Sequence, residues 1–296
     1  MTQIIANLSQ ISARYDALFC DLWGCLHNGV TPFPAAVAAL QAFRAKGGKV
    51  VLLTNAPRPK SSVVKQLDEM AVPRDTWDDV VTSGDAAQYA MLSGAVGRKV
   101  HFIGSPKDEV FFTDIAEDLQ AVGAANPPMQ RVATKDAEGL VVTGLADDLT
   151  ETPEDYRATL LLSKNLGLPM LCANPDIIVH LGDKLLYCAG ALAKMYEEMG
   201  GTALYFGKPH PPIYDLARRR LVALGGAEDS RILCVGDGIH TDVQGAIGES
   251  LDALFVTGGI AHESFGLDSD NPDKDLLEDW LEDGMLSPSY SIGHLR

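Results

Sequence analysis

The chain has 296 residues, of which 46% are hydrophobic and 22% charged, as in a folded globular protein. Its formal net charge of −16 argues against nucleic-acid binding, which requires a basic surface, and disfavours docking on anionic membranes. No apolar run reaches the roughly 18 residues of a membrane span, and residues 1–15 lack a secretory pattern. The five cysteines are scattered, which predicts reduced thiols in a cytoplasmic protein and neither disulfides nor a zinc site.

Short apolar runs alternate with segments of helical spacing along the chain. The predicted strands are, in chain order, Ala17–Cys20, Val50–Leu53, Asp79–Val81, Lys99–Ile103, Leu140–Val142, Pro169–Cys172, Ala203–Phe206, Ile232–Val235 and Ala253–Val256. The predicted helices are Pro34–Ala45, Ser61–Met70, Thr152–Leu166, Ala189–Met199, Pro212–Leu224, Thr241–Glu249 and an acidic amphipathic segment within Asp268–Gly284. This alternation predicts an α/β fold, a doubly wound, Rossmann-like parallel sheet with right-handed crossovers.

The number of predicted strands exceeds what a simple doubly wound domain contains. Residues 84–201 have strand and helix units of their own and lack the acid and lysine clusters described below. We therefore predict that residues 1–83 and 202–296 form a core domain, and that residues 84–201 form a second α/β domain inserted into it.

Reactive side chains follow three of the predicted core strands. Asp21 follows the first strand, Thr54 and Asn55 follow the second, and Asp237 and Asp242 lie five residues apart after a later one. Each pattern by itself is also ordinary turn or helix-capping chemistry. Because ligands bind at the carboxyl edge of open α/β sheets, the three patterns together predict one site at that edge.

The chemistry of these residues suits a phosphate and a metal ion. Two neighbouring carboxylates such as Asp237 and Asp242 favour a hard cation that prefers oxygen ligands. Thr54 offers a hydroxyl to a phosphate oxygen, and strand-end amides do the same. Lys208, set between Gly207 and Pro209, is placed to offset the charge of a carboxylate and a phosphate together.

With these residues in view, the sequence resembles the haloacid dehalogenase (HAD) superfamily, whose four motifs match Asp21, Thr54, Lys208 and the pair of Asp237 and Asp242. It is most similar to class IIA, the NagD-type and nitrophenylphosphatase-like hydrolases. The resemblance covers about residues 15–260 and includes Gly29 with Pro34, Leu52–Asn55, Ala173–Asp176, Gly207–Pro209, and Gly236–Asp237 with Thr241–Asp242. In this class a large α/β cap lies between the second and third motifs, where the inserted segment lies here.

The resemblance implies a Mg²⁺-dependent phosphatase acting on a small phosphorylated metabolite. Asp21 matches the nucleophile that becomes an aspartyl-phosphate. Mg²⁺ would be held by the carboxylates of Asp21 and Asp237 and the backbone carbonyl of Trp23. Asp242 would contact the metal through water or orient the motif lysine. The transferring phosphoryl group would be bound by Thr54, Asn55 and Lys208.

The cap implied by the resemblance would choose the substrate. Asn174 and Asp176 match a cap loop that faces the core site, and a plain Asn-Pro turn is the alternative for the same residues. Gly190 would begin the helix beneath this loop, and Ser83 is placed either to reach the substrate or to form a turn. Sugar phosphates, nucleotides and pyridoxal phosphate are all compatible with these residues. Class IIA proteins are often dimers through their caps, so the resemblance implies a homodimer.

Trp23 departs from the family pattern. Phosphatases of this superfamily carry a second aspartate there, which protonates the leaving oxygen and later activates water. Its loss predicts slow turnover of poor leaving groups, because general acid–base catalysis contributes about 10²–10⁴ in rate. His27 is a candidate substitute acid, and a loop residue hydrogen-bonded with Asn28 is the alternative interpretation of this histidine.

Three rival functions follow from the same departure. Dehalogenases of the superfamily carry an aromatic residue at this position, although they need no metal and lack the paired acids that Asp237 and Asp242 supply here. A catalytically weakened protein that binds a phosphorylated ligand or a partner is the second. The third is a phosphotransferase that forms the aspartyl-phosphate without rapid hydrolysis.

Overall fold

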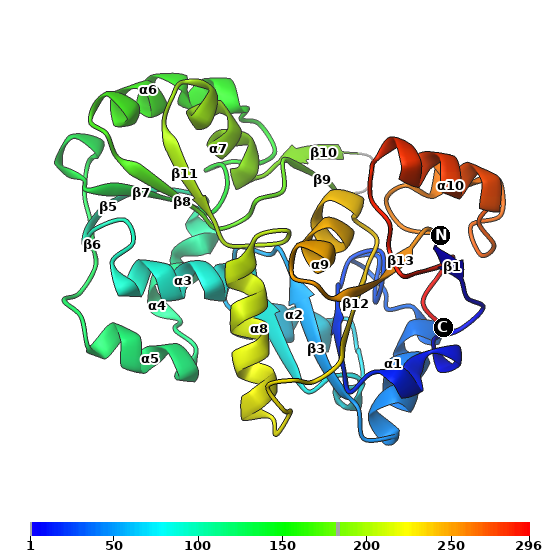
Figure 1. The fold of residues 1–296 in the computed structure, drawn as a ribbon. Coiled ribbons are helices and arrows are strands. Elements are labelled where there is room, and N and C mark those ends of the chain that lie inside the picture. Colours follow the sequence, from blue (N-terminus) through cyan, green and yellow to red (C-terminus); the bar gives the residue numbers. More distant parts are fainter. Residues whose placement is uncertain (1, 182–183) are drawn as a thin grey trace. The chain divides into compact units, whose positions relative to one another are not determined.

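The structure is a computed structural model that describes residues 2–181 and 184–296 (Figure 1). It divides the chain into two compact units. Unit 1 comprises Met1–Thr54, Val64–Val81 and Tyr214–Arg296, and unit 2 comprises Asn55–Val63 and Thr82–Ile213. Each unit has its own parallel sheet with helices between successive strands, which confirms the predicted α/β fold class. Among the described residues, no helix is both long and apolar enough to cross a membrane.

The sheet of unit 1 has seven strands. Their spatial order is β1 (Gln3–Ile4), β14 (Tyr290–Ile292), β13 (Asp252–Val256), β12 (Ile232–Gly236), β2 (Ala17–Cys20), β3 (Lys49–Thr54) and β4 (Asp79–Thr82). The central strand β2 is parallel to both neighbours, with Ala17 opposite Lys49 of β3 and Ile232 of β12. Strands β2 and β12 are buried along their whole length, as their continuous apolar runs predicted.

Helices and short turns connect these strands. They are α1 (Pro34–Ala45), α2 (Lys60–Glu69), α8 (Pro211–Ala223), α9 (Gln244–Gly248) and α10 (Lys274–Asp283), with 3₁₀ turns at Leu8–Gln10, Ser12–Arg14, Arg74–Thr76 and His262–Phe265 and a π-helical turn at Ile239–Val243. Helix α1 has its predicted bounds. Proline is tolerated in the first turn of a helix, and Gly47 beyond the last turn adopts a φ of +91° that favours glycine.

Unit 2 has a five-stranded parallel sheet and a separate hairpin. The sheet order is β11 (Thr202–Tyr205), β8 (Pro169–Cys172), β7 (Gly139–Val142), β5 (Lys99–Ile103) and β6 (Gln130–Arg131), and the antiparallel hairpin consists of β9 (Ile178–Leu181) and β10 (Lys184–Tyr187). Its helices are α3 (Ser83–Ser93), α4 (Val110–Thr113), α5 (Glu117–Ala124), α6 (Arg157–Asn165) and α7 (Ala189–Glu198), with 3₁₀ turns at Pro106–Glu109, Thr134–Asp136 and Pro153–Tyr156. Tyr196 lies at the centre of the unit's core, where its hydroxyl donates to the carbonyl of Leu168 at 2.6 Å.

One strand lies in a different sheet from the one predicted. Strand β11 was assigned to the core domain with residues 202–296, but it pairs in parallel with β8, with Thr202 opposite Pro169. An apolar strand carries no local signal for which of two sheets it joins, because pairing depends on a distant partner strand. The identification of unit 1 as a core and of unit 2 as a cap stays a prediction.

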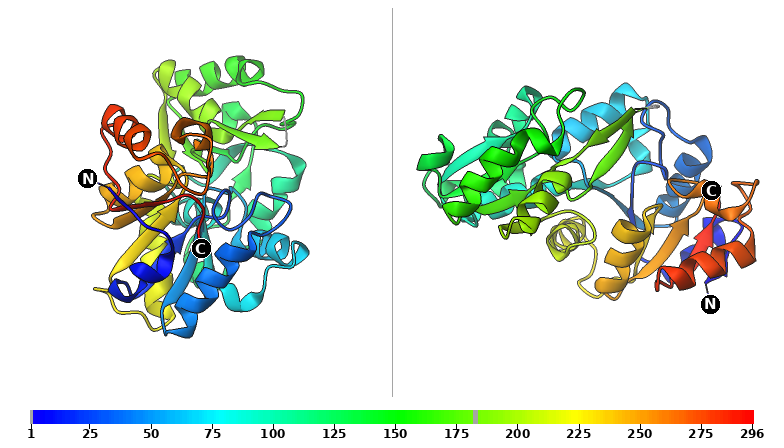
Figure 2. Two further views of the ribbon diagram at one scale, coloured as in Figure 1. Left: turned by 90° about the vertical axis from the view of Figure 1, so that its right-hand side faces the viewer. Right: turned by 90° about the horizontal axis from the view of Figure 1, so that it is seen from above.

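The two ends of the described chain lie side by side in unit 1 (Figure 2). Strand β1 pairs in parallel with β14, with Gln3 opposite Tyr290. The backbone N–H of Leu8 donates to the carbonyl of Arg296 at 2.7 Å. The edge strand β1 and its neighbour β14 are two and three residues long. Such short segments give no periodic signal, which is why the sequence analysis did not predict them.

An ion pair joins α1 to the start of the sheet. Asp78 accepts hydrogen bonds from the Arg44 guanidinium at 2.9 and 2.8 Å and from the Val50 N–H at 2.8 Å. Burial raises the pKa of this carboxyl, but the hydrogen bonds outweigh it, so the pKa of Asp78 lies below its ordinary value. The ionised carboxylate therefore stabilises the fold.

We expect Asp78→Asn to lower the free energy of unfolding at neutral pH by about 1–2 kcal/mol, because the pair is partly exposed. A group with a lowered folded pKa stabilises the fold above its unfolded pKa, about 4, and loses this effect as the pH falls through the folded value. The gap between wild type and variant in urea unfolding should therefore be constant above about pH 5 and close below pH 4. Asp229→Asn, in the exposed turn before β12, is the control and should leave stability unchanged.

Candidate active site

Asp21 follows the central strand of unit 1. Its backbone N–H donates to the carbonyl of Val235 at 2.8 Å, so the ladder between β2 and β12 continues to the residue itself. The carboxylate therefore emerges at the carboxyl edge of the sheet, next to the point where β12 ends and Asp237 follows. Both carboxylates are buried. The structure thus places these two acids close together, as predicted.

Gly24 allows the turn after Asp21 to pass close to Asp237. This glycine has a φ of +71°, and a Cβ atom added to it would lie 1.9 Å from the Oδ2 of Asp237. The turn is closed by the N–H groups of Leu26 and His27, which donate to the carbonyl of Leu22 at 2.8 and 3.0 Å. A side chain at Gly24 would both strain the backbone and displace the acid.

The second acidic segment differs from its prediction in form. A helix over Thr241–Glu249 was expected, but residues Ile239–Val243 form a π-helical turn before the short helix α9. In this turn the Oδ2 of Asp242 accepts hydrogen bonds from the Gly238 N–H at 3.1 Å and the Thr241 hydroxyl at 3.3 Å. A single π-helical turn is the kind of local distortion that often occurs at functional sites.

Asp237 is oriented by the loop after β13. The N–H of Ile260 donates to its Oδ2 at 2.9 Å, and a Cβ atom at Gly259 would lie 2.1 Å from the same oxygen. Neither residue was predicted from the sequence, because no local pattern connects a loop more than twenty positions away to this acid. A backbone donor of this kind favours the ionised carboxylate.

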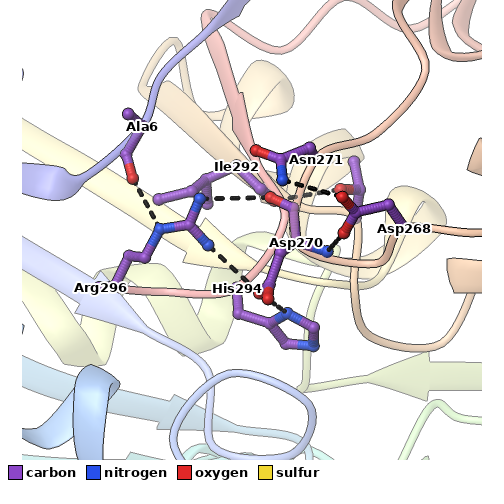
Figure 3. A network of polar contacts seen from close by, with 8 residues as sticks. Ala6, Asp268, Asp270, Asn271, Ile292, His294 and Arg296 are labelled. Carbon is purple, nitrogen blue, oxygen red and sulfur yellow. Dashed lines mark hydrogen bonds and ion pairs between the residues drawn. The ribbon is translucent and has the colours of Figure 1, made fainter.

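The same loop is fastened by the last residues of the chain (Figure 3). The carboxylate of Asp270 lies 2.9 Å from the Nδ1 of His294 and accepts a hydrogen bond from the guanidinium of Arg296 at 3.3 Å. Arg296 also donates to the carbonyl of Ala6 at 2.8 Å. The ring of His294 packs so closely on Gly258 that a Cβ atom there would lie 2.5 Å from Nε2. The segment that follows β13 and positions Asp237 is therefore held by contacts with the last residues of the described chain.

Asp21, Cys25 and Asp237 form the one group of potential metal ligands found within the described ranges, 2–181 and 184–296. Their ligand atoms all lie within 4.8 Å of one another, and all three residues are buried. Two buried carboxylates at this spacing fit a hard cation such as Mg²⁺. Asp242 lies outside this group, which is compatible with the predicted contact through water. Burial, followed by the charges of Asp237 and Asp21, raises the pKa of the Cys25 thiol well above its ordinary value.

Trp23 and His27 lie against each other at the turn. Their rings meet edge to face at 5.5 Å, and the indole also covers Gly29, where a Cβ atom would lie 2.1 Å from it. Trp23 is 43% exposed and His27 only 1%. The indole N–H of Trp23 can donate a hydrogen bond, but it is too weak an acid to protonate a leaving group.

His27 is unsuited to the role of substitute acid, which corrects the sequence-based hypothesis. Its Nδ1 accepts a hydrogen bond from the Gly29 N–H at 3.0 Å, so this nitrogen carries no proton. Burial lowers the pKa of His27 to about 4, and the imidazole is neutral at physiological pH. The alternative interpretation, a loop residue, fits better, although the partner is the backbone of Gly29 and not Asn28.

The remaining predicted residues lie in unit 2, apart from Thr54, which ends β3 in unit 1. Asn55 connects two of them. Its side-chain amide donates to the carboxylate of Asp176 at 2.8 Å and to the carbonyl of Lys208 at 3.1 Å, and its Oδ1 accepts from the Lys208 N–H at 2.7 Å. The side chain of Asn55 thus fixes the loop that carries the lysine, and only its backbone amide remains for the predicted phosphate contact.

The predicted cap loop is a compact turn within unit 2. The Oδ1 of Asn174 accepts from the N–H of Asp176 at 3.0 Å, as in an Asn-initiated turn. The carbonyl of Asp176 in turn accepts from the Gly190 N–H at 3.1 Å, in the first turn of α7. Gly207 passes so near that a Cβ atom would lie 2.5 Å from Asn55 Oδ1. The structure therefore joins Asn55, Asn174, Asp176 and Lys208 in one cluster.

A cavity of about 350 Å³ lies elsewhere in unit 1. It is lined by Gln41, Arg44, Ala45, Gly47, Gly48, Lys49, Asp75 and Asp78. Lys49 begins β3 and Thr54 ends it, so this cavity lies at the amino edge of the sheet and Asp21 at the carboxyl edge. In open α/β sheets ligands bind at the carboxyl edge, so we assign the site to the acids and not to the cavity.

Comparison with known proteins places the chain in a family. A model of haloacid dehalogenase-like hydrolases matches residues 18–123, and a HAD-hydrolase-like model matches residues 205–282. The structure of a haloacid dehalogenase-like hydrolase from Brucella suis is 40% identical, with a TM-score of 0.81 over 98% of this chain and 99% of that chain.

Two further similarities come from Mycobacterium tuberculosis. Its D-glycerol 3-phosphate phosphatase is 30% identical over 86% of this chain and 66% of its own length. A structure of glycerol phosphate phosphatase in complex with magnesium has a TM-score of 0.64 and 27% identity, over 87% of this chain and 73% of that chain. These findings confirm the resemblance on which the class IIA prediction depends. The chain belongs to the haloacid dehalogenase-like hydrolase family.

Proposed function

We propose that this protein is a Mg²⁺-dependent phosphatase that hydrolyses a small phosphomonoester through an aspartyl-phosphate on Asp21. The observation that supports it most is the meeting of two buried carboxylates, Asp21 and Asp237, at the carboxyl ends of adjacent parallel strands. The relative from M. tuberculosis is a D-glycerol 3-phosphate phosphatase. The similar solved structure from that organism is a glycerol phosphate phosphatase in complex with magnesium.

The donor atoms of unit 1 fit the ion. Asp21, the backbone carbonyl of Trp23 and Asp237 would hold it, with Asp242 acting through water. Bound Mg²⁺ would offset the negative charge that both the carboxylates and the phosphate bring to the site. The Ile260 N–H and the narrow passage at Gly24 and Gly259 keep the Asp237 carboxylate in one orientation, which prepares the site for the ion.

In the first step a carboxylate oxygen of Asp21 attacks phosphorus, and the bond to the leaving oxygen breaks. In the second step water attacks the phosphorus of the aspartyl-phosphate, which releases inorganic phosphate and restores the Asp21 carboxylate. Thr54, Lys208 and the backbone amide of Asn55 would bind the phosphoryl oxygens, so that most of the rate comes from positioning and electrostatics.

Trp23 makes this a phosphatase for good leaving groups. With an indole at position 23 and a neutral His27, neither residue can protonate an alkoxide as it departs. Leaving groups that depart readily as anions, such as aryl oxides, need no such proton. The second step slows for the same reason, because the absent carboxylate would also activate water.

Substrate selection by Asn174 and Asp176, a homodimer through unit 2 and a cytoplasmic location remain part of the proposal.

The test is phosphate release from a panel of aryl and alkyl phosphates, each with Mg²⁺ and with EDTA. We expect Mg²⁺-dependent release that is fastest for the aryl esters. Absence of release from every ester would refute the phosphatase, and the same samples would then separate its rivals. Ligand binding alone would indicate a binding protein, a lasting phosphoenzyme would indicate a phosphotransferase, and halide release would indicate a dehalogenase.

Gly24→Ala should weaken Mg²⁺ binding by about tenfold or more, because the added methyl group falls on the oxygen of Asp237. The matched control is Gly47→Ala. Gly47 has a φ of +91° and nothing within 4 Å of an added Cβ, so it shares the backbone strain without the collision. Both variants should lose about 1–2 kcal/mol of stability, and only Gly24→Ala should lose Mg²⁺ affinity in calorimetry. Equal Mg²⁺ affinities in the two variants would contradict the assignment of Asp237.

A further inference from the structure

Of the three potential metal ligands Asp21, Cys25 and Asp237, Cys25 is the one that the proposed phosphatase chemistry does not use. This residue is 1% exposed, and its Sγ lies within 4.8 Å of the ligand oxygens of both Asp21 and Asp237. The thiols of Cys20 and Cys172 donate to backbone carbonyls, whereas no hydrogen bond of the described residues involves the Sγ of Cys25. A thiol is thus held beside two carboxylates without a partner of its own.

We propose that Asp21, Cys25 and Asp237 also form a coordination site for a thiophilic divalent cation of the Zn²⁺ or Cd²⁺ type, which competes with Mg²⁺. Soft thiolate ligands select such ions, whereas Mg²⁺ prefers oxygen ligands and water. The same pocket therefore has two ligand sets, one of oxygens alone and one that adds sulfur. This inference rests on the proposed function only for the competition with Mg²⁺.

The geometry requires only a small closure. Zinc binds sulfur at about 2.3 Å and carboxylate oxygen at about 2.1 Å, so ligand atoms of a tetrahedral site lie roughly 3.5 Å apart. The three ligand atoms here lie within 4.8 Å of one another. Movements of about 1 Å, within the reach of side-chain rotation, bring them to one ion. As the metal–sulfur bond forms, the thiol proton passes to solvent, and no group is oxidised or reduced.

The consequence is inhibition. An ion held by Asp21, Cys25 and Asp237 takes the place of Mg²⁺, and a thiolate bond holds it more tightly than oxygen ligands alone. Low concentrations of Zn²⁺ or Cd²⁺ should therefore block turnover in the presence of a large excess of Mg²⁺. The scattered cysteines of the sequence give no pattern for such a site, because two of its three ligands are carboxylates and one of them is distant in sequence.

The experiment is a titration of the full-length protein with Cd²⁺, followed by the ultraviolet charge-transfer absorption of a cadmium–thiolate bond. Cys25→Ser is the test variant and Cys172→Ser the control, because the second thiol lies in β8 of unit 2. Near-ultraviolet circular dichroism first shows that each variant is folded. Should Cys25→Ser fail to fold, Asp237→Asn replaces it, since loss of a carboxylate ligand must also weaken Cd²⁺ binding.

We expect the absorption to appear with one equivalent of Cd²⁺, to persist in Cys172→Ser and to vanish in Cys25→Ser. The Cd²⁺ affinity should fall in that variant by about 10- to 100-fold or more, while calorimetry shows no loss of Mg²⁺ affinity. Increasing Mg²⁺ should shift the Cd²⁺ titration of the wild type to higher Cd²⁺ concentrations. Persistence of the band in Cys25→Ser, or a Cd²⁺ titration that Mg²⁺ leaves unchanged in a wild type that binds Mg²⁺, would overturn the inference. A wild type that shows the band but binds no Mg²⁺ would refute the proposed function instead.

Discussion

Asp21→Asn should lower kcat for aryl phosphates by roughly 10⁴- to 10⁶-fold, the scale of loss when a covalent nucleophile is removed. The amide keeps the size of the side chain, and it follows a β2 strand that is buried throughout. It cannot attack phosphorus, and it removes one negative charge from the group that fits the metal. The variant should also form no phosphoenzyme, which intact-protein mass spectrometry of rapidly quenched samples would detect in the wild type.

Asp16→Asn is the matched control for this variant. Asp16 precedes the same strand and pairs with the guanidinium of Arg231 at 2.7 Å at the opposite edge of the sheet. The hydrogen bonds from Arg231 lower the pKa of Asp16 to about 2, so Asp16→Asn removes an ionised carboxylate at neutral pH. The exposed pair contributes little stability, about 1 kcal/mol or less. A kcat for Asp21→Asn equal to that of Asp16→Asn would exclude Asp21 as the nucleophile.

Trp23→Asp should raise kcat for alkyl phosphates by about 100-fold or more, because it introduces the acid that the turn lacks. Aryl phosphates should respond weakly, since their leaving groups depart as anions. The ratio of the two rates is the quantity to measure, over pH 5 to 9. A new dependence on a group that must be protonated should accompany the gain for alkyl esters.

Trp23→Asn separates the acid from the loss of the indole. Both variants uncover Gly29 and remove the edge-to-face contact with His27, so they should lose similar stability, about 1–3 kcal/mol. Only the aspartate can donate a proton. Equal rates for the two variants on alkyl phosphates would mean that leaving-group protonation is already supplied by another residue.

The strands and the order of the acids were predictable from the sequence alone. Within residues 2–181 and 184–296, continuous apolar runs predicted all nine strands of four or more residues in the two larger sheets, because a strand buried on both faces needs a core-forming residue at nearly every position. The placement of Asp21 and Asp237 followed from topology, since parallel strands end at one edge. The family was also predictable, because its motifs are strand-end residues, and the comparisons confirm it.

The tertiary structure decided what depends on distant partners. It placed β11 beside β8, supplied the Ile260 N–H to Asp237, and used the side chain of Asn55 to hold Lys208. Local patterns carry no information about such contacts. His27 is the clearest case: the sequence shows a titratable ring near the nucleophile, but only its burial and its bond to Gly29 make it a neutral acceptor. Cys25 became a candidate ligand in the same way, because folding alone sets its sulfur beside two carboxylates.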